Sequence, residues 1–158
     1  MMRFAIPCTA LKLVLCNEVV EILRAHVQAA SGSMESVGQL YASSLASSEV
    51  SIQTATVLQP KCAHRTRVVI DKALAEAERR TMFENRMHCV GVWHTHPEPY
   101  PSPSIDDIAL AEDYARAASD AGVAGVVFVV VGTAPFPNGL YVGVHDGDAM
   151  HKAVFVES

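Results

Sequence analysis

The sequence has no long apolar run, no cluster of basic residues and no closely spaced pair of cysteines. A membrane-spanning helix needs about 20 apolar residues, and no run approaches that length. The formal net charge is −5, with 12 Lys and Arg against 17 Asp and Glu, and no stretch concentrates the basic side chains. That charge distribution disfavours nucleic-acid binding. We therefore expect neither a membrane nor a nucleic acid as a partner.

The cysteines point to a reducing compartment. Cys8, Cys16, Cys62 and Cys89 are scattered without a Cys-x-x-Cys pair, which excludes a zinc ribbon and a thioredoxin-like motif. We expect buried, reduced thiols in a cytoplasmic protein. The apolar run 11–16 resembles the core of a signal peptide only weakly, because Lys12 interrupts it.

Length and composition indicate one globular domain over residues 1–158. Half of the residues are hydrophobic and 18% are charged, which is far from the composition of disordered chains. A chain of 158 residues is long enough to bury a core of its own.

Two histidines stand at the end of a predicted strand. Residues 90–93, Val-Gly-Val-Trp, are short, apolar and β-prone, and His94-Thr95-His96-Pro97 follows directly. Because residues i and i+2 of a strand point to the same face, the imidazoles of His94 and His96 should lie side by side. Such a pair is half of a tetrahedral zinc site.

Asp107 is the candidate third ligand. Ser104-Ile105-Asp106-Asp107 is a capping-box variant, with Ser104 as N-cap of a helix to about residue 121. A first-turn carboxylate would then face the strand end. Two histidines and one carboxylate leave one coordination position open, as in catalytic zinc sites. Either pattern alone also occurs without a metal, as a plain helix cap or a chance His-x-His.

Together, the spacing His-x-His-Pro, with Ser at the tenth residue after the first His and Asp at the thirteenth, resembles the JAMM motif of the JAB1/MPN/Mov34 metalloprotease family. The stretches 91–98 and 103–107 look most like bacterial members that cleave ubiquitin-like conjugates, including those of CBASS anti-phage operons. The resemblance covers roughly residues 35–131. It implies Zn²⁺ as cofactor, and His94, His96 and Asp107 as its ligands.

The resemblance also implies two catalytic residues, Ser104 as oxyanion donor and Glu35 as general base. The family carries its base in a segment Glu-x-Gly-Gly-x-Leu-x-Gly. In this sequence Gly38 and Leu40 fit that segment, while Val37 and Ala42 replace two glycines. The alternative for Glu35 is a solvent-facing residue at a strand edge. Glu49 and Glu98 are the next candidates for the base.

The remaining pattern predicts alternating strands and helices. Alternation and turn residues indicate strands at 3–7, 34–42, 50–58, 67–70, 125–131 and 139–144. Residues 34–42 and 50–58 should form a hairpin, and the wholly apolar 125–131 should be a central strand. Helices are expected from Glu18, capped by Asn17, to about 30, and from Asp71, as cap, to about 87. On the second helix we expect a solvated charged face, comprising Lys72, Glu76, Glu78, Arg79, Arg80 and Glu84, with apolar contacts from Leu74, Ala77 and Phe83.

This order, together with the resemblance, implies a three-layer α/β fold, the MPN (JAB/JAMM, cytidine-deaminase-like) fold, with a mixed curved sheet flanked by helices. His145 and His151 are expected at the surface, with a role at the metal as the alternative. Surface or packing positions are expected for His26, His64 and His88.

Three functions compete. The first is a bacterial, cytoplasmic peptidase or isopeptidase that hydrolyses the amide bond after the C-terminal glycine of a ubiquitin-like protein, in conjugation or antiviral defence. The second is processing of a small sulfur-carrier protein in cofactor or amino-acid biosynthesis. The third is a non-catalytic MPN scaffold, although scaffolds usually lack the ligands that are complete here. A zinc nucleobase deaminase is excluded, because it needs His-x-Glu and a later Pro-Cys-x-x-Cys.

Overall fold

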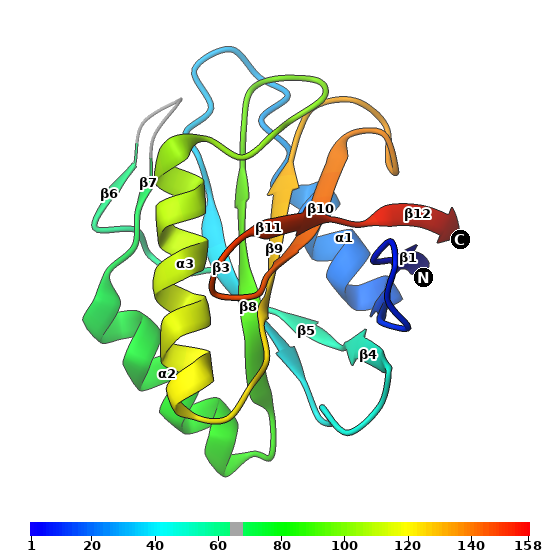
Figure 1. Ribbon diagram of the computed structural model, residues 1–158. Coiled ribbons are helices and arrows are strands. Elements are labelled where there is room, and N and C mark those ends of the chain that lie inside the picture. The colour runs from blue at the N-terminus through cyan, green and yellow to red at the C-terminus, as the bar shows by residue number, and fades with distance from the viewer. Residues whose placement is uncertain (64–67) are drawn as a thin grey trace.

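A computed structural model describes residues 1–63 and 68–158, and in this part of the chain three helices surround two main sheets (Figure 1). The helices are α1 (Asn17–Ala25), α2 (Lys72–Glu84) and α3 (Ile105–Asp120). None of the described helices is long and apolar enough to cross a membrane.

The larger sheet positions the candidate site. Its spatial order is β11 (Met150–Lys152), β10 (Leu140–His145), β9 (Val126–Val131), β8 (His88–Thr95), β3 (Val37–Ala42) and β5 (Thr54–Ala55). β8 and β9 are parallel, and the other neighbours are antiparallel. The predicted central strand is confirmed, because every residue of β9 is buried.

A smaller sheet was not predicted. It runs in the order β12 (Val154–Glu157), β1 (Met2–Ala5), β2 (Lys12–Leu15) and β4 (Glu49–Ile52). The short strands β6 (Cys62–Ala63) and β7 (Val68–Val69) pair separately.

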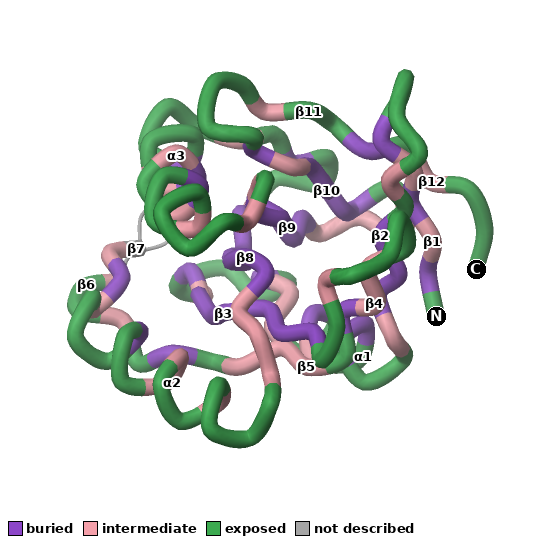
Figure 2. Tube along the Cα trace, turned by 60° about the horizontal axis from the view of Figure 1, so that its bottom comes forward, coloured by how far each residue is buried: buried purple, intermediate pink, exposed green. Residues whose placement is uncertain are grey.

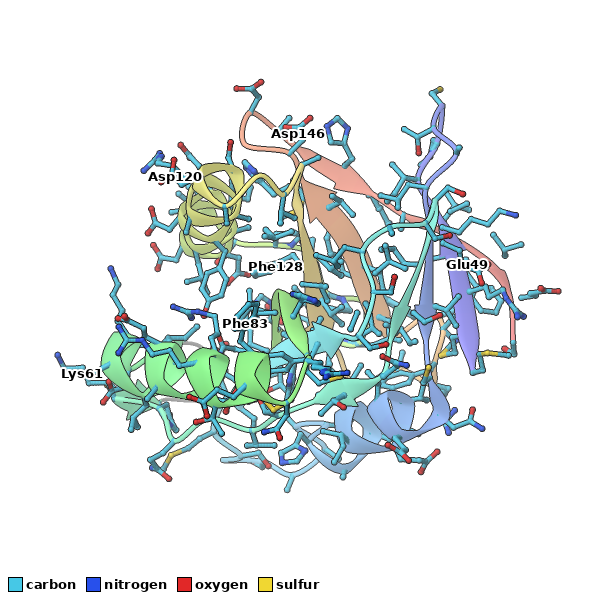
Figure 3. The ribbon with its side chains drawn as sticks, turned by 90° about the horizontal axis from the view of Figure 1, so that it is seen from below. Glu49, Lys61, Phe83, Asp120, Phe128 and Asp146 are labelled. Atoms are coloured by element: carbon cyan, nitrogen blue, oxygen red, sulfur yellow. The ribbon has the colours of Figure 1, made fainter. Side chains whose placement is uncertain are left out.

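The larger sheet is the middle layer of three, as the sequence predicted. Along β9, Val127, Val129 and Val131 face a core that includes α1 and strands of the smaller sheet, while Phe128 and Val130 face the opposite core. The opposite core is covered by α2 through Ala75 and by α3 through Ala111. Figures 1 and 2 show these helices on one side of β8 and β9 and α1 on the other, and Figure 3 shows Phe128 inside the molecule.

Several local predictions were wrong. α1 ends at Ala25 instead of about residue 30, and its N-cap is Cys16 rather than Asn17. The apolar run 11–16 contains strand β2, which was not predicted. The expected strand 50–58 divides in two, because β4 pairs in parallel with β2 while only β5 forms the expected antiparallel pair with β3.

The exposed surface also differs from expectation. Leu74 and Phe83 on α2 are exposed, whereas Glu78 and Arg79 turn inward and form hydrogen bonds with the sheet. Cys8 and Cys62 are exposed, and the other two cysteines are partly exposed. The prediction that the thiols are buried was therefore wrong.

Candidate metal centre

The end of β8 presents two imidazoles to the α3 side of the sheet. His94 is paired with Val37 on β3 and with Val130 on β9, and both neighbours belong to the core beneath α2 and α3. His96 follows on the same face and is held by a hydrogen bond from its backbone N–H to the carbonyl of Val131, at 2.8 Å. The rings lie 4.7 Å apart between centroids. The predicted side-by-side arrangement of His94 and His96 is confirmed.

The start of α3 supplies a carboxylate to both rings. The capping box predicted from the sequence is complete, because the Asp107 N–H donates to Ser104 Oγ at 3.1 Å and the Ser104 N–H donates to Asp107 Oδ2 at 2.7 Å. This cap turns the Asp107 carboxylate toward the sheet. Its Oδ1 lies 2.9 Å from His94 Nε2, and its Oδ2 lies 3.2 Å from His96 Nε2.

Glu35 joins the group from the segment before β3. Its neighbour Ser36 extends the ladder with β8, because the Ser36 N–H donates to Thr95 Oγ1 and the Thr95 N–H donates to the Ser36 carbonyl. Glu35 Oε2 lies 3.8 Å from His94 Nδ1, and Oε1 lies 4.0 Å from His96 Nε2. Only 4% of Glu35 is exposed, so it is not a solvent-facing edge residue.

A side chain at Gly38, three residues after Glu35, is excluded on steric grounds. A Cβ on Gly38 would stand 1.7 Å from the Thr56 carbonyl oxygen and 2.5 Å from Trp93 Nε1. Trp93 donates to that same carbonyl at 2.9 Å. Gly38 therefore leaves room for the hydrogen bond between the Trp93 indole and the Thr56 carbonyl against β3.

These residues fit a metal ion. Glu35, His94 and His96 each offer one ligand atom, and these atoms all lie within 4.8 Å of one another. Ligands of a tetrahedral zinc, about 2.0–2.1 Å from the ion, stand about 3.3 Å apart. Asp107 lies close to that separation from both histidines, nearer than Glu35.

The hydrogen-bonding of His94 supports the same conclusion. Both ring nitrogens are buried, and neither makes a hydrogen bond of good geometry within the described chain, although Asp107 Oδ1 is only 2.9 Å from Nε2. Buried polar atoms are almost always hydrogen-bonded, and a bound ion is one explanation for an exception. A cation between His94 Nε2, His96 Nε2 and the Asp107 carboxylate would be a partner for the first of these nitrogens.

The electrostatics of the centre favour positive charge. Burial alone would lower the pKa of His94, but the carboxylates of Asp107 and Glu35 outweigh it and raise the pKa to about 9. Burial alone would raise the pKa of Asp107, but contacts with His94 and His96 and the Ser104 N–H hold it well below its usual value.

The other histidines that the structure describes lie away from the centre. His145 is buried, not at the surface as predicted, and its Nδ1 accepts from the Gly147 N–H at 3.1 Å. It pairs with Val126, four residues along β9 from the partner of His94, which is about 13 Å of strand. His151 is at the surface, 2.6 Å from Asp146 Oδ2. His26 packs edge-on against Trp93.

The structure also places His88 and Glu49. His88 packs against the ring of Phe83. Glu49 is exposed on β4 of the smaller sheet, which removes it as an alternative base. His64 lies outside the described residues.

Glu98 was expected only as an alternative base. The structure places its carboxylate on the outer side of His96, away from the position of a base. Its Oε2 lies 3.3 Å from His96 Nδ1, so it contacts the centre from outside. The sequence indicates this contact only through the position of Glu98, two residues after His96.

Two comparisons concern solved structures and curated sequences. The solution structure of protein DSY2949 from Desulfitobacterium hafniense superposes with a TM-score of 0.63, at 16% sequence identity, over 92% of this chain and 90% of that one. At that identity the likeness shows a shared fold. A comparison with curated protein sequences found no match.

A family model covers most of the chain and includes all of the residues of the metal centre. Its match confirms the predicted resemblance, with boundaries wider than residues 35–131. Residues 17–141 match the family of prokaryotic homologs of the JAB domain, Prok-JAB, and the chain belongs to that family.

Proposed function

We propose that the protein is a zinc-dependent peptidase or isopeptidase that hydrolyses the amide bond after the C-terminal glycine of a ubiquitin-like protein. One observation carries the proposal. Two histidines and two carboxylates from three separate segments converge in a buried group, and both ring nitrogens of His94 lack a hydrogen bond within the described chain. A scaffold has no need of such an arrangement.

The donor set suits zinc in a catalytic site. We assign His94, His96 and Asp107 as the ligands, which leaves the fourth position for water or substrate. A zinc ion bound there would act as a Lewis acid and bring the pKa of a bound water to about 7. The Ser104 N–H bond to Asp107 Oδ2 fixes the carboxylate in its orientation toward both rings.

Glu35 is the general base in this proposal. Its carboxylate stands farther from the histidines than Asp107 does, which suits a group that works beside the ligands rather than among them. It would accept the proton of the attacking water and deliver it to the leaving amine. With only 4% of Glu35 exposed, its surroundings restrict the motion of the side chain.

Ser104 is the oxyanion donor. Its Oγ accepts a hydrogen bond from the Asp107 N–H, and this leaves the hydroxyl proton available for another acceptor. Ser104 is exposed, so a substrate carbonyl can approach it. The hydroxyl would then stabilise the negative charge that develops on that carbonyl oxygen.

The substrate class is supported by the resemblance of the motif to bacterial enzymes that cleave ubiquitin-like conjugates. A role in cytoplasmic antiviral defence follows from the same likeness. A glycine-tailed sulfur-carrier protein would meet the same chemistry, so substrate preference must be measured.

The test is a cleavage assay with zinc-loaded protein. Two fusions, ubiquitin and a sulfur-carrier protein each followed by a short peptide after the C-terminal glycine, are incubated and the products weighed by mass spectrometry. We expect cleavage after glycine that stops on chelation and in Glu35→Gln. Bound zinc without cleavage of either fusion would support the scaffold and overturn the proposal.

A further inference from the structure

His96 has a carboxylate at each of its ring nitrogens. Nε2 faces the centre, 3.2 Å from Asp107 Oδ2 and 4.0 Å from Glu35 Oε1. Nδ1 faces outward, 3.3 Å from Glu98 Oε2. Glu98 is thus the carboxylate on the outer side of a candidate ligand.

The backbone around Glu98 is fixed although its side chain is 59% exposed. Its carbonyl accepts from the Thr133 N–H at 2.9 Å, in the loop after β9. A Cβ on Gly132 would stand 2.6 Å from the same carbonyl oxygen and 2.4 Å from Pro101 Cδ, so glycine permits this close approach of the two loops. The Glu98 side chain therefore starts from a fixed backbone position beside His96.

We propose that Glu98 is a positioning residue that holds the His96 ring with Nε2 toward the centre. When a neutral imidazole ligates a metal through Nε2, its proton is on Nδ1, where the Glu98 carboxylate is placed to accept it. That form presents the lone pair of Nε2 to the centre, where the proposed function needs a ligand atom. The inference rests on the proposed metal site, and it adds a residue outside the ligand set.

The expected effect is modest. Partners that orient a ligating histidine usually change metal affinity by about 10–100-fold. Water competes for the exposed Glu98 carboxylate, which places the effect at the low end, about tenfold.

The first measurement is zinc affinity, by competition with a chromophoric chelator. We expect Glu98→Ala to bind zinc about tenfold more weakly than wild type, and Glu98→Gln to lose less because its amide oxygen still accepts. The matched control is Asp106→Ala, which removes an exposed carboxylate next to Asp107 in the first turn of α3. It should bind within about twofold of wild type.

The second measurement follows the proton on the outer nitrogen. ¹⁵N–¹H NMR of histidine-labelled, zinc-loaded protein should show the His96 Nδ1 proton exchanging with water faster in Glu98→Ala than in wild type. Wild-type affinity and an unchanged exchange rate in that variant would overturn the inference, as would an equal loss of affinity in Asp106→Ala. A wild-type protein that binds no zinc would refute the proposed function, and the inference with it.

Discussion

Two groups of polar side chains lie on the same face of the larger sheet, and they differ in how completely they hydrogen-bond. Along β3 and the segment before it, Glu35 belongs to the metal centre, Val37 to the apolar core, and Gln39 to a second group, which we call the Glu78 network. The network consists of Gln39, Tyr41, Thr56, Glu78, Arg79 and Tyr114.

In the Glu78 network the side chains satisfy one another. Glu78 Oε1 accepts from Tyr41 at 2.7 Å, from Thr56 at 2.6 Å and from Gln39 Nε2 at 3.0 Å. Burial raises the pKa of Tyr114 to about 12, so its hydroxyl remains neutral and donates to Gln39. These contacts hold α2 against the sheet.

The metal centre has the opposite character. Among the described residues, the His94 ring makes no hydrogen bond of good geometry, although the carboxylates of Asp107 and Glu35 lie 2.9 Å and 3.8 Å from its two nitrogens and raise its pKa. The comparison teaches that the Glu78 network satisfies its own hydrogen bonds, whereas the candidate metal centre gathers imidazoles and carboxylates in an arrangement that could hold a cation.

The largest expected effect is on catalysis by Glu35→Gln. The substitution preserves shape and removes the base, so hydrolysis should fall by about 10²–10⁴-fold. Zinc content and melting temperature should remain near wild type. Turnover measured on the fusion substrates checks this, and activity retained within a few-fold would move the base elsewhere.

Ser104→Ala should lower turnover by about 10²–10³-fold, because an oxyanion donor acts in the transition state. It also removes a helix cap, which costs about 1 kcal/mol of stability. Asp71→Ala is the matched control, because Asp71 caps α2 through the N–H groups of Ala73 and Leu74, away from the centre. Equal turnover in the two variants would show that Ser104 serves only as the N-cap of α3.

Glu78→Ala should destabilise the protein by disrupting the Glu78 network. It removes the acceptor of three hydrogen bonds and leaves the buried Tyr41 hydroxyl without one, so the free energy of unfolding should fall by about 2–3 kcal/mol in urea titrations. Glu76→Ala, on the same helix, removes an exposed ion pair with Arg80 and should cost less than about 1 kcal/mol. Loss of zinc in Glu78→Ala would show that the two groups are not independent.

Much of the metal centre could be predicted from the sequence because its signals are local. The strand period places His94 and His96 on one face, and the capping box that begins at Ser104 orients Asp107. The middle layer was predictable for the same reason, since the apolar run of β9 is typical of a strand buried on both faces.

The Glu78 network could not be predicted, because nothing local distinguishes a buried helix charge from a solvated one. Glu78 and Arg79 stand among charged neighbours, and their partners Gln39 and Tyr41 lie on a strand far back along the chain. The smaller sheet was missed for a similar reason. It joins β1 and β2 to β12 at the other end of the chain, and pairing at such distance depends on tertiary packing.

The most direct test of the account is the zinc content of purified variants, measured by elemental analysis. Wild type and Glu78→Ala should each hold one zinc per chain, whereas His94→Ala should hold none, because a ligand has been removed from one cluster and not from the other. Stoichiometric zinc in His94→Ala would contradict the assignment of this centre.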